Sequence, residues 1–592
     1  MKTNNAHSFH IPVMGIGYTL DTPIKVAHLG ISSVVSLVDD MLIERMRRLY
    51  AEKYSFPYVA ISRKTPDARA KRITAYLNLM SEIVKARVKD LSSKFIEKSS
   101  ELSKYISLLP DTSCLKIEFG KLISDNVSSE KVADWVKKNL PVGSIDVNIM
   151  TKLDKESSQK SEQSSTENND AHSALRGFAN SNLSSSVVLS AGMNPRLYSY
   201  MEKFDDFYFD QNGIQKKKII IKVSDYRSAL IQGKFFAKKG IWVSEYRIES
   251  GLNCGGHAFA TDGHLLGPVL KDFKTNKLTL REELINILSK ALEAKDLPLP
   301  ADIPKIRISA QGGVGTAAEH NFLLKEYELD SIGWGTPFLL VPEAVNVDVE
   351  TRSLLKDAEE EDLYLSNVSP LGIPFNNLKN NSQDVLKGKR VEKGKPGSPC
   401  VKKYASLNKE FTENVICIAS RQYQSKKIEE LKNQSLDVEQ YEKEHKQIVE
   451  KACICVGLGV STLKANNLDT KFEGSGVSIC PGPNLAYFSK VVSLKDMVDH
   501  IYGKSNVMVR TDRPNLFMKE LGMYVDHFKS QVDKLVVPIT ARHEKQLEAF
   551  RQNVFDGIAY YQEIFGELID QVERDQNGLT KMKAELADFS LS

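Results

Sequence analysis

The first half of the chain alternates short runs of β-branched and other apolar residues with longer stretches of helical periodicity. This alternation is typical of βα units and predicts a parallel sheet, for which an α/β barrel is the natural arrangement. A short helix is expected at Thr22–Gly30, and strands are expected at Ile11–Ile16, Ile31–Val38, Ser144–Met150, Ser186–Ser190, Lys218–Val223, Ile241–Glu249, Lys305–Ala310 and Leu329–Gly333. Eight such strands would close a TIM (β/α)8 barrel, whose active site lies at the carboxyl ends of the strands.

Two segments interrupt this pattern. Residues from about 39 to 143 are charged, periodic and mostly helical. They form an insertion too long for an ordinary connection, and we expect it to overhang the barrel mouth. The second segment, from about 153 to 185, contains the polar tract KESSQKSEQSSTENNDAHSA. It is too poor in apolar residues to pack and is predicted to be a flexible surface loop.

The chain beyond residue 345 has a different character, so we expect three regions. Residues 1–345 would form the barrel, residues 346–490 an accessory region that contains cysteines, and residues 491–592 a helical region. Helices are expected at Lys426–Lys451, Arg513–Leu535 and Ala541–Val572. The amphipathic faces of the last two would pack on the barrel or on another subunit, so a homo-oligomer is an open alternative.

Length and composition exclude some classes of protein. A chain of 592 residues is too long for one core. Lys and Arg number 80 against 76 Asp and Glu, which gives no indication of a nucleic-acid partner. No apolar run reaches the roughly 20 residues that span a bilayer, and the polar start lacks the order of a signal peptide. The sequence therefore predicts no membrane association and, by default, a cytoplasmic location.

Glycine clusters follow the last two predicted strands. Gln311, Gly312 and Gly313 come directly after the seventh strand, and Gly335 and Thr336 follow the eighth. Glycine lets the backbone approach an anion closely, and the loops after strands seven and eight are the usual phosphate site of this fold. The two clusters predict a cofactor that carries phosphate, although either could simply turn the chain.

Two further side chains at strand ends point to redox chemistry. His257 follows Gly255 and Gly256 after the sixth strand, where two glycines leave space for a flat ring and the imidazole suits proton transfer near neutral pH. Lys222 ends the fifth strand, where a cation would lie against the electron-rich edge of a flavin. Each residue also has a plain structural interpretation, as a packed histidine or a solvated lysine.

In these motifs the chain resembles the nitronate monooxygenase family, formerly called 2-nitropropane dioxygenases, which are FMN-dependent barrels that include the flavin-dependent enoyl reductases of fatty-acid synthesis. The similarity runs in order through about 345 residues. It is carried by IPVMGIG from Ile11, VNIM with Asn148, SAGMNP from Ser190, Lys222, SGLNCGGH, QGGVG and GWGTPFLLVPEA. Asn253 departs from the pattern, because many members of the family carry an acidic residue there.

The resemblance implies a non-covalent FMN and a small-molecule substrate. His257 would take the proton α to an activating group, electrons would pass to the flavin, and oxygen or another acceptor would reoxidise it. The resemblance also implies cofactor contacts at Met14, Gly15, Asn148, Ser190, Lys222, Ser250, Gly255, Gln311, Gly312, Gly313, Gly335 and Thr336. Two alternatives stay open: an enoyl-thioester-type reductase that uses NAD(P)H or an iron–sulfur redox partner, and a non-catalytic barrel scaffold.

The accessory region gathers most of the cysteines. Five of the seven are Cys400, Cys417, Cys453, Cys455 and Cys480, and several lie beside Gly or Pro turns that expose backbone amides. Thiolates in such surroundings bind an iron–sulfur cluster or zinc, and a cluster next to a flavin would exchange single electrons. There is no CxxC pair, so buried free cysteines are the alternative.

Overall fold

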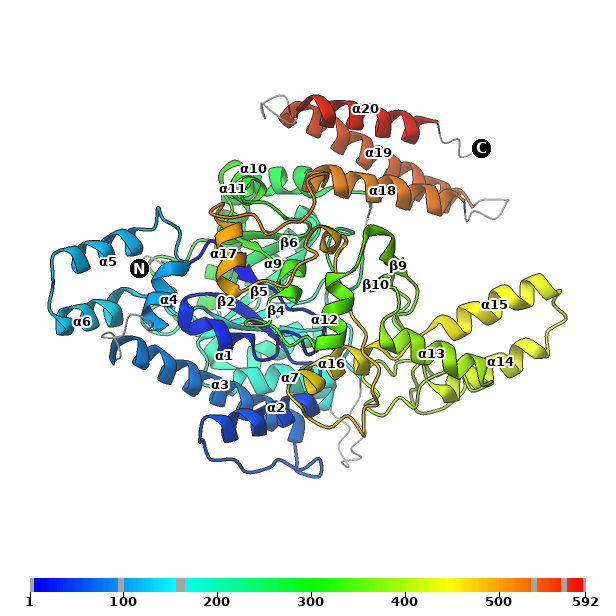
Figure 1. The fold of residues 1–592 in the computed structure, drawn as a ribbon, viewed down its shortest axis with the longest axis horizontal. Coiled ribbons are helices and arrows are strands. Elements are labelled where there is room, and N and C mark those ends of the chain that lie inside the picture. The colour runs from blue at the N-terminus through cyan, green and yellow to red at the C-terminus, as the bar shows by residue number, and fades with distance from the viewer. Residues whose placement is uncertain are drawn as a thin grey trace.

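The computed structural model describes residues 5–93, 101–155, 166–260, 262–533, 540–565 and 572–588. Its centre is a closed barrel of eight parallel strands in sequential order, which confirms the predicted TIM barrel (Figure 1). The strands are β1 (Phe9–Ile11), β2 (Ser32–Ser36), β3 (Ile145–Ile149), β4 (Ser185–Leu189), β5 (Lys217–Val223), β6 (Val243–Glu249), β7 (Arg307–Gln311) and β8 (Ser331–Gly333).

Strand β1 closes the barrel, because His10 pairs with Ser32 of β2 on one side and with Gly333 of β8 on the other. The prediction that the first strand runs over Ile11–Ile16 was wrong. The strand ends at Ile11, because Pro12 lacks an amide hydrogen and Gly15 has a left-handed φ of 53°. Residues 12–15 are instead a loop at the barrel mouth.

The interior of the barrel is filled below that mouth. Residues 245, 247 and 249 of β6 share one face of the strand, since side chains alternate. Glu245 is buried and accepts hydrogen bonds from Arg247 Nη2 at 2.8 Å and from Ser309 Oγ at 2.6 Å. The ion pair of Glu245 and Arg247 fills the barrel interior on the amino-terminal side of Glu249. The space for a ligand therefore lies at the carboxyl ends of the strands.

Helices surround the barrel as the βα pattern predicts. Those up to residue 356 are α1 (Thr22–Val26), α2 (Asp40–Lys53), α3 (Ala68–Ser93), α4 (Glu101–Leu108), α5 (Cys114–Ser124), α6 (Ser129–Asn139), α7 (Asp170–Ala179), α8 (Pro195–Tyr200), α9 (Tyr226–Ala237), α10 (Leu266–Glu293), α11 (Ala317–Glu326) and α12 (Val349–Lys356). Short 3-10 helices lie at Ala27–Leu29, Thr166–Asn168, Met201–Lys203, Asp205–Phe207, Thr336–Leu340, Glu360–Asp362 and Pro483–Tyr487.

The insertion consists of α2 to α6 and lies along the side of the barrel (Figure 1). Helix α3 packs on α2 and α7. No described residue between 39 and 143 lines the cavity at the barrel mouth, so the described part of the insertion does not form the wall of the cavity. Within the predicted flexible loop, residues 156–165 lie outside the described residues. The rest includes α7, whose buried face contains Leu175 and Phe178, and that part is therefore not a loop.

The accessory region contains a two-stranded antiparallel sheet of β9 (Leu363–Ser366) and β10 (Phe375–Leu378) with α13 (Ser382–Glu392), α14 (Arg421–Lys432), α15 (Val438–Glu450) and α16 (Ile454–Ala465). The single helix predicted at Lys426–Lys451 is divided into α14 and α15. Helix α14 ends at Lys432 with Asn433 as its C-cap, and Asp437 caps α15 by accepting a hydrogen bond from Gln440 N at 2.8 Å.

The C-terminal region contains α17 (Leu494–Ile501), α18 (Leu516–Val532), α19 (Ala541–Phe565) and α20 (Val572–Ala587). Helices α18, α19 and α20 pack together, and α18 and α19 also contact α10 of the barrel (Figure 1). Helix α18 begins at Leu516 because Asn515 caps it, accepting from the amides of Phe517 and Met518 at 3.0 Å. None of the helices in the described ranges is long and apolar enough to cross a membrane.

Candidate active site at the barrel mouth

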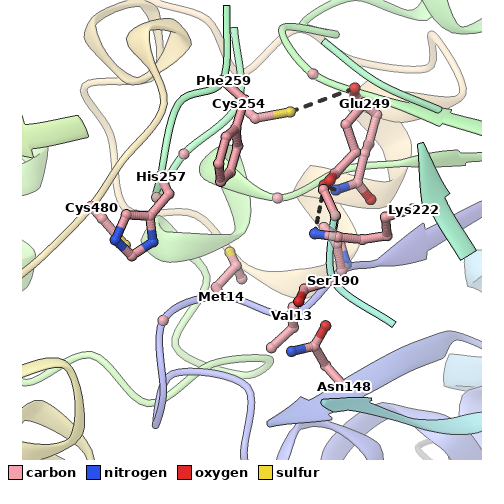
Figure 2. A pocket seen from close by; sticks show the side chains of 18 of the residues that line it. Val13, Met14, Asn148, Ser190, Lys222, Glu249, Cys254, His257, Phe259 and Cys480 are labelled. Carbon is pink, nitrogen blue, oxygen red and sulfur yellow. Dashed lines mark hydrogen bonds and ion pairs between the residues drawn. The ribbon is translucent and has the colours of Figure 1, made fainter. Parts of the chain in front are cut away.

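A cavity of about 430 Å³ lies at the carboxyl ends of the barrel strands (Figure 2). This volume is in the range of pockets that bind cofactors and drug-sized ligands. All thirteen residues expected from the sequence to be catalytic or to contact a cofactor line this cavity: Met14, Gly15, Asn148, Ser190, Lys222, Ser250, Gly255, His257, Gln311, Gly312, Gly313, Gly335 and Thr336. They come from seven of the eight strand ends, and the fold brings them to one place.

Lys222, the next-to-last residue of β5, forms an ion pair that the sequence did not indicate. Its Nζ lies 2.7 Å from Glu249 Oε1 (Figure 2). The same oxygen accepts a hydrogen bond from Gln311 Nε2. Glu249 was predicted only as the last residue of a strand. Its carboxylate fixes the orientation of both neighbours and balances the lysine charge.

One buried acceptor at the cavity has no hydrogen-bond partner among the described residues. Asn148 Oδ1 is buried without a hydrogen bond among the described residues, and Asn148 lines the cavity. Gln311 Oε1 is also buried, but its neighbour is the His10 imidazole, which does not line the cavity. A buried acceptor without a donor costs free energy, on the order of 1–3 kcal/mol, so Asn148 Oδ1 suits a ligand that brings an N–H or O–H donor.

The loop after β7 is shaped for close backbone approach. Gly312 and Gly313 have φ of 123° and 75°, and a Cβ atom at Gly313 would lie 2.0 Å from Asn253 Nδ2. Glu319 already accepts hydrogen bonds from the amides of Gly315 and Thr316. The two glycines thus let the loop after β7 pack closely against the β6 loop, where a Cβ atom at Gly312 would lie 2.7 Å from Ser250 Cβ.

The loop after β8 is open toward the cavity. A Cβ atom at Gly335 would lie 3.3 Å from Pro12 Cγ and 3.9 Å from Met14 Sδ, both of which belong to cavity residues. The next residue, Thr336, accepts a hydrogen bond at Oγ1 from Gly482 N at 2.9 Å. The loop is therefore held in place by the accessory region while Gly335 keeps room for a ligand.

His257 lies at the edge of the cavity, between the barrel and the accessory region. Its Nε2 is 2.7 Å from Ser369 Oγ, and its ring meets Phe375 edge-on at 5.0 Å. Burial and the positive charge of Lys152 lower the pKa of His257 to about 4. The imidazole is therefore neutral at physiological pH and is able to accept a proton.

The accessory region forms the roof of the cavity, which the sequence did not predict. The roof residues are Pro370, Leu371, Ile373, Ala405, Ile454, Cys455, Leu458, Ile479, Cys480 and Asn484. Backbone hydrogen bonds connect them to the β6 loop, since Gly256 N donates to Cys480 O at 3.2 Å and Asn376 N donates to Gly256 O at 2.8 Å. The cavity is thus enclosed by both halves of the chain.

A buried carboxyl group of α18 supports the β6 loop from below. Glu520 accepts hydrogen bonds from Ser250 Oγ at 2.5 Å and from Leu266 N at 2.9 Å. Because the side chain is removed from water, the pKa of Glu520 is raised to about 7. Neither Glu520 nor Ser369 carries a motif, so only the fold identifies them.

The five cysteines considered as metal ligands divide into two places. Cys480 lies in the cavity roof, and Cys400, Cys417 and Cys453 are buried away from it. Cys455 both lines the cavity and lies beside Cys453. In the part of the chain that the structure describes, no group of three or more His, Cys, Asp or Glu side chains is arranged to hold a metal ion.

Comparisons with known proteins give only distant similarities. No protein-family model and no curated protein matches the chain. FabK from Thermotoga maritima is 13% identical over 68% of this chain and 83% of its own, with a TM-score of 0.29. The enoyl reductase domain of MlnA from Bacillus amyloliquefaciens is 15% identical over 70% and 88%, with a TM-score of 0.32. Nitroalkane oxidase from Streptomyces ansochromogenes is 9% identical over 84% and 94%, with a TM-score of 0.34.

Proposed function

We propose that this protein is an FMN-dependent oxidoreductase of the nitronate monooxygenase type. The observation that carries the proposal is the convergence of the thirteen residues on one cavity at the carboxyl ends of the strands. Similarity to solved structures at these TM-scores carries no argument, so the proposal rests on the residues of this chain.

The residues present fit a bound FMN. Gly335 would leave the space and Thr336 would supply an amide for the phosphate, as expected of the loop after strand eight. Asn148 Oδ1 would accept a hydrogen bond from the polar edge of the ring system. Lys222, steadied by Glu249, would offer a cation to the edge where negative charge gathers on reduction.

The imidazole of His257 would carry out the proton transfer. His257 is neutral at physiological pH, and Ser369 holds its Nε2, so Nδ1 is the nitrogen that would take the proton α to an activating group of the substrate. The roof would exclude water from the reaction. Bound FMN would supply a two-electron acceptor that oxygen reoxidises.

A second candidate is an enoyl-thioester-type reductase that draws electrons from NAD(P)H or an iron–sulfur partner. The observation that favours it is Cys455, which lines the cavity and lies beside other buried thiols. A thiolate-bound redox centre supplied by a partner at this wall of the cavity would deliver single electrons.

Anaerobic mixing of the purified holoprotein with different electron donors separates these functions. The proposal predicts that a nitronate bleaches the flavin without nicotinamide and that air then restores the colour with consumption of oxygen. Bleaching by NADH or NADPH, followed by reoxidation with an enoyl thioester, would assign the reductase instead. A flavin that no donor reduces would leave only a non-catalytic scaffold.

A further inference from the structure

Lys152 is a cation of the cavity wall whose charge no described carboxylate balances. Among the described residues that line the cavity, the charged side chains are Lys152, Lys222 and Glu249. Glu249 pairs with Lys222 at 2.7 Å, whereas Lys152 is in no ion pair within the described ranges. Lys152 is also exposed, so a ligand can reach it. The cavity therefore carries an excess positive charge at Lys152.

The side chain of Lys152 lies against a glycine of the neighbouring loop. Lys152 follows β3 and Gly192 follows β4. A Cβ atom at Gly192 would lie 2.8 Å from Lys152 Cε, so a larger residue would displace the lysine. Thr151 Oγ1 donates a hydrogen bond to Gly192 O at 2.8 Å, and Asn194 Nδ2 donates to Thr151 O at 3.1 Å. The two loops are therefore joined next to the lysine, and the absence of a side chain at Gly192 makes room for it.

The ammonium group of Lys152 lies over an aromatic ring of the β6 loop. Lys152 Nζ is 4.4 Å from the centroid of the Phe259 ring. Phe259 is in the same loop as His257, and both side chains border the cavity (Figure 2). The ring attracts the cation, and the N–H groups that do not face the ring stay available to a ligand. Lys152 is therefore held close to the candidate base, in agreement with the effect of its charge on the pKa of His257.

The place of Lys152 in the barrel separates it from the loop expected to hold the phosphate of FMN. The eight strands follow one another in sequential order, so β3 lies across the barrel mouth from β7, which is next to β8. Lys152 follows β3, whereas Gly335 and Thr336 follow β8. An anion bound at Lys152 is therefore a different group from the cofactor phosphate.

We propose that Lys152 binds a carboxylate of the substrate, which is an aliphatic compound that carries this carboxylate in addition to its reacting group. One unbalanced cation matches a monoanion, and none of the described lining residues is an arginine, the side chain suited to bidentate binding of phosphate. The roof presents aliphatic side chains, among them Leu371, Ile454 and Leu458, to the carbon chain between the two groups. The inference rests on the proposed function for the reaction of this substrate but not for the binding of its carboxylate.

Calorimetric titration of the purified full chain with hexanoate and with hexanamide tests the binding without turnover. The two ligands have the same carbon chain and differ in charge. We expect hexanoate to bind about tenfold more tightly, the effect of one hydrogen bond to a charged group. K152M should abolish this preference, and K152R, which keeps the charge, should retain most of it. K137M is the control, because it removes an exposed lysine of α6 outside the cavity, and it should behave as wild type does.

Undetectable binding of hexanoate, equal affinities of wild type for the two ligands, or a preference that K152M keeps would overturn the inference. Loss of FMN from K152M alone would also overturn it, because the lysine would then belong to the cofactor site. Turnover reports separately on the proposed function: the nitronate of ω-nitrohexanoate should have a lower KM than that of its methyl ester, and K152M should remove the difference. If wild type binds hexanoate through Lys152 but oxidises neither nitronate, the proposed function is wrong and the carboxylate site stands.

Discussion

The Nε2 atom of His257 lies 2.7 Å from the hydroxyl oxygen of Ser369. The two residues are 112 positions apart, one in the loop after β6 and the other in the accessory region. The contact means that the candidate base is oriented by the second half of the chain. Residues 346–490 thus complete the site.

Replacement of His257 by alanine tests its role in proton transfer. We expect H257A to bind FMN as wild type does and to lower kcat by roughly 10²–10⁴-fold, the usual contribution of a positioned base. S369A is the matched variant, since it keeps the imidazole and removes only its hydrogen-bond partner. It should have a smaller effect. Unchanged turnover in H257A would contradict the assignment.

The pKa of His257 predicts the acidic limb of the pH profile. Because the neutral imidazole is the active form and its pKa is lowered to about 4, kcat/KM should fall only near pH 4 and should not change from about pH 5.5 upward on account of this group. Lys152 contributes to the lowering, so K152M should move the limb to higher pH. A limb in wild type near the ordinary histidine value would disprove this interpretation.

An added methyl group in the loop after β8 should weaken cofactor binding. The Cβ of G335A would project toward Pro12 and Met14 at 3.3 and 3.9 Å, a fit that the fold tolerates but that narrows the cavity. We expect FMN affinity to fall at least tenfold, about 1.4 kcal/mol. Titration of the apoprotein with FMN measures the affinity. G388A, on α13 with nothing within 4 Å of the added atom, should bind FMN as wild type does.

Glu520 makes stability depend on pH. Its folded-state pKa is raised to about 7, so the folded chain holds a proton that the unfolded chain releases above about pH 4.5. The contribution of Glu520 to the free energy of unfolding is therefore fully present below pH 4.5. It is lost as the pH rises to about 7, by roughly 3 kcal/mol in total. E520Q imitates the protonated form, so its Tm relative to wild type should rise between pH 5 and 7.5.

The control for Glu520 is E548Q, which changes a carboxyl group of α19 that is 57% exposed. Its Tm difference from wild type should stay constant over the same pH range. If the Tm difference between E520Q and wild type also stayed constant over this pH range, the pKa of Glu520 would be that of an ordinary glutamate.

The buried ion pairs of Lys402 predict a large loss of stability on truncation. K402M would leave Asp39 buried without its cation and Glu473 with only Arg45, at 3.3 Å, and the side chains of Lys402, Asp39 and Glu473 are at most 2% exposed. We expect a loss of about 3–5 kcal/mol in the free energy of unfolding. K495M removes a lysine that is 54% exposed and should cost about 1 kcal/mol or less. Equal losses in the two variants would contradict the account.

The barrel and the residues at its mouth could be predicted from the sequence because their signals are local. Each strand is a short apolar run, Gly312 follows its strand directly, and His257 stands in the short glycine-containing loop after its strand. The strand predicted at Ile11–Ile16 was wrong for a local reason. The apolar run continues beyond Pro12, whereas β1 ends before it, at Ile11.

The roof and its supports could not be predicted in this way. Glu520 reaches Ser250 across 270 positions, and His257 reaches Ser369 across 112. Such contacts depend on tertiary packing, which no periodicity encodes. The sequence grouped five cysteines, but it did not show that Cys480 lies in the roof while Cys400, Cys417 and Cys453 are buried away from the cavity.

The most direct test of the central claim is the absorption spectrum of the purified protein, with identification of any flavin released on denaturation. If FMN binds at the barrel mouth, the spectrum has maxima near roughly 370 and 450 nm and denaturation releases FMN in stoichiometric amount. A colourless protein that takes up no added FMN would contradict the claim.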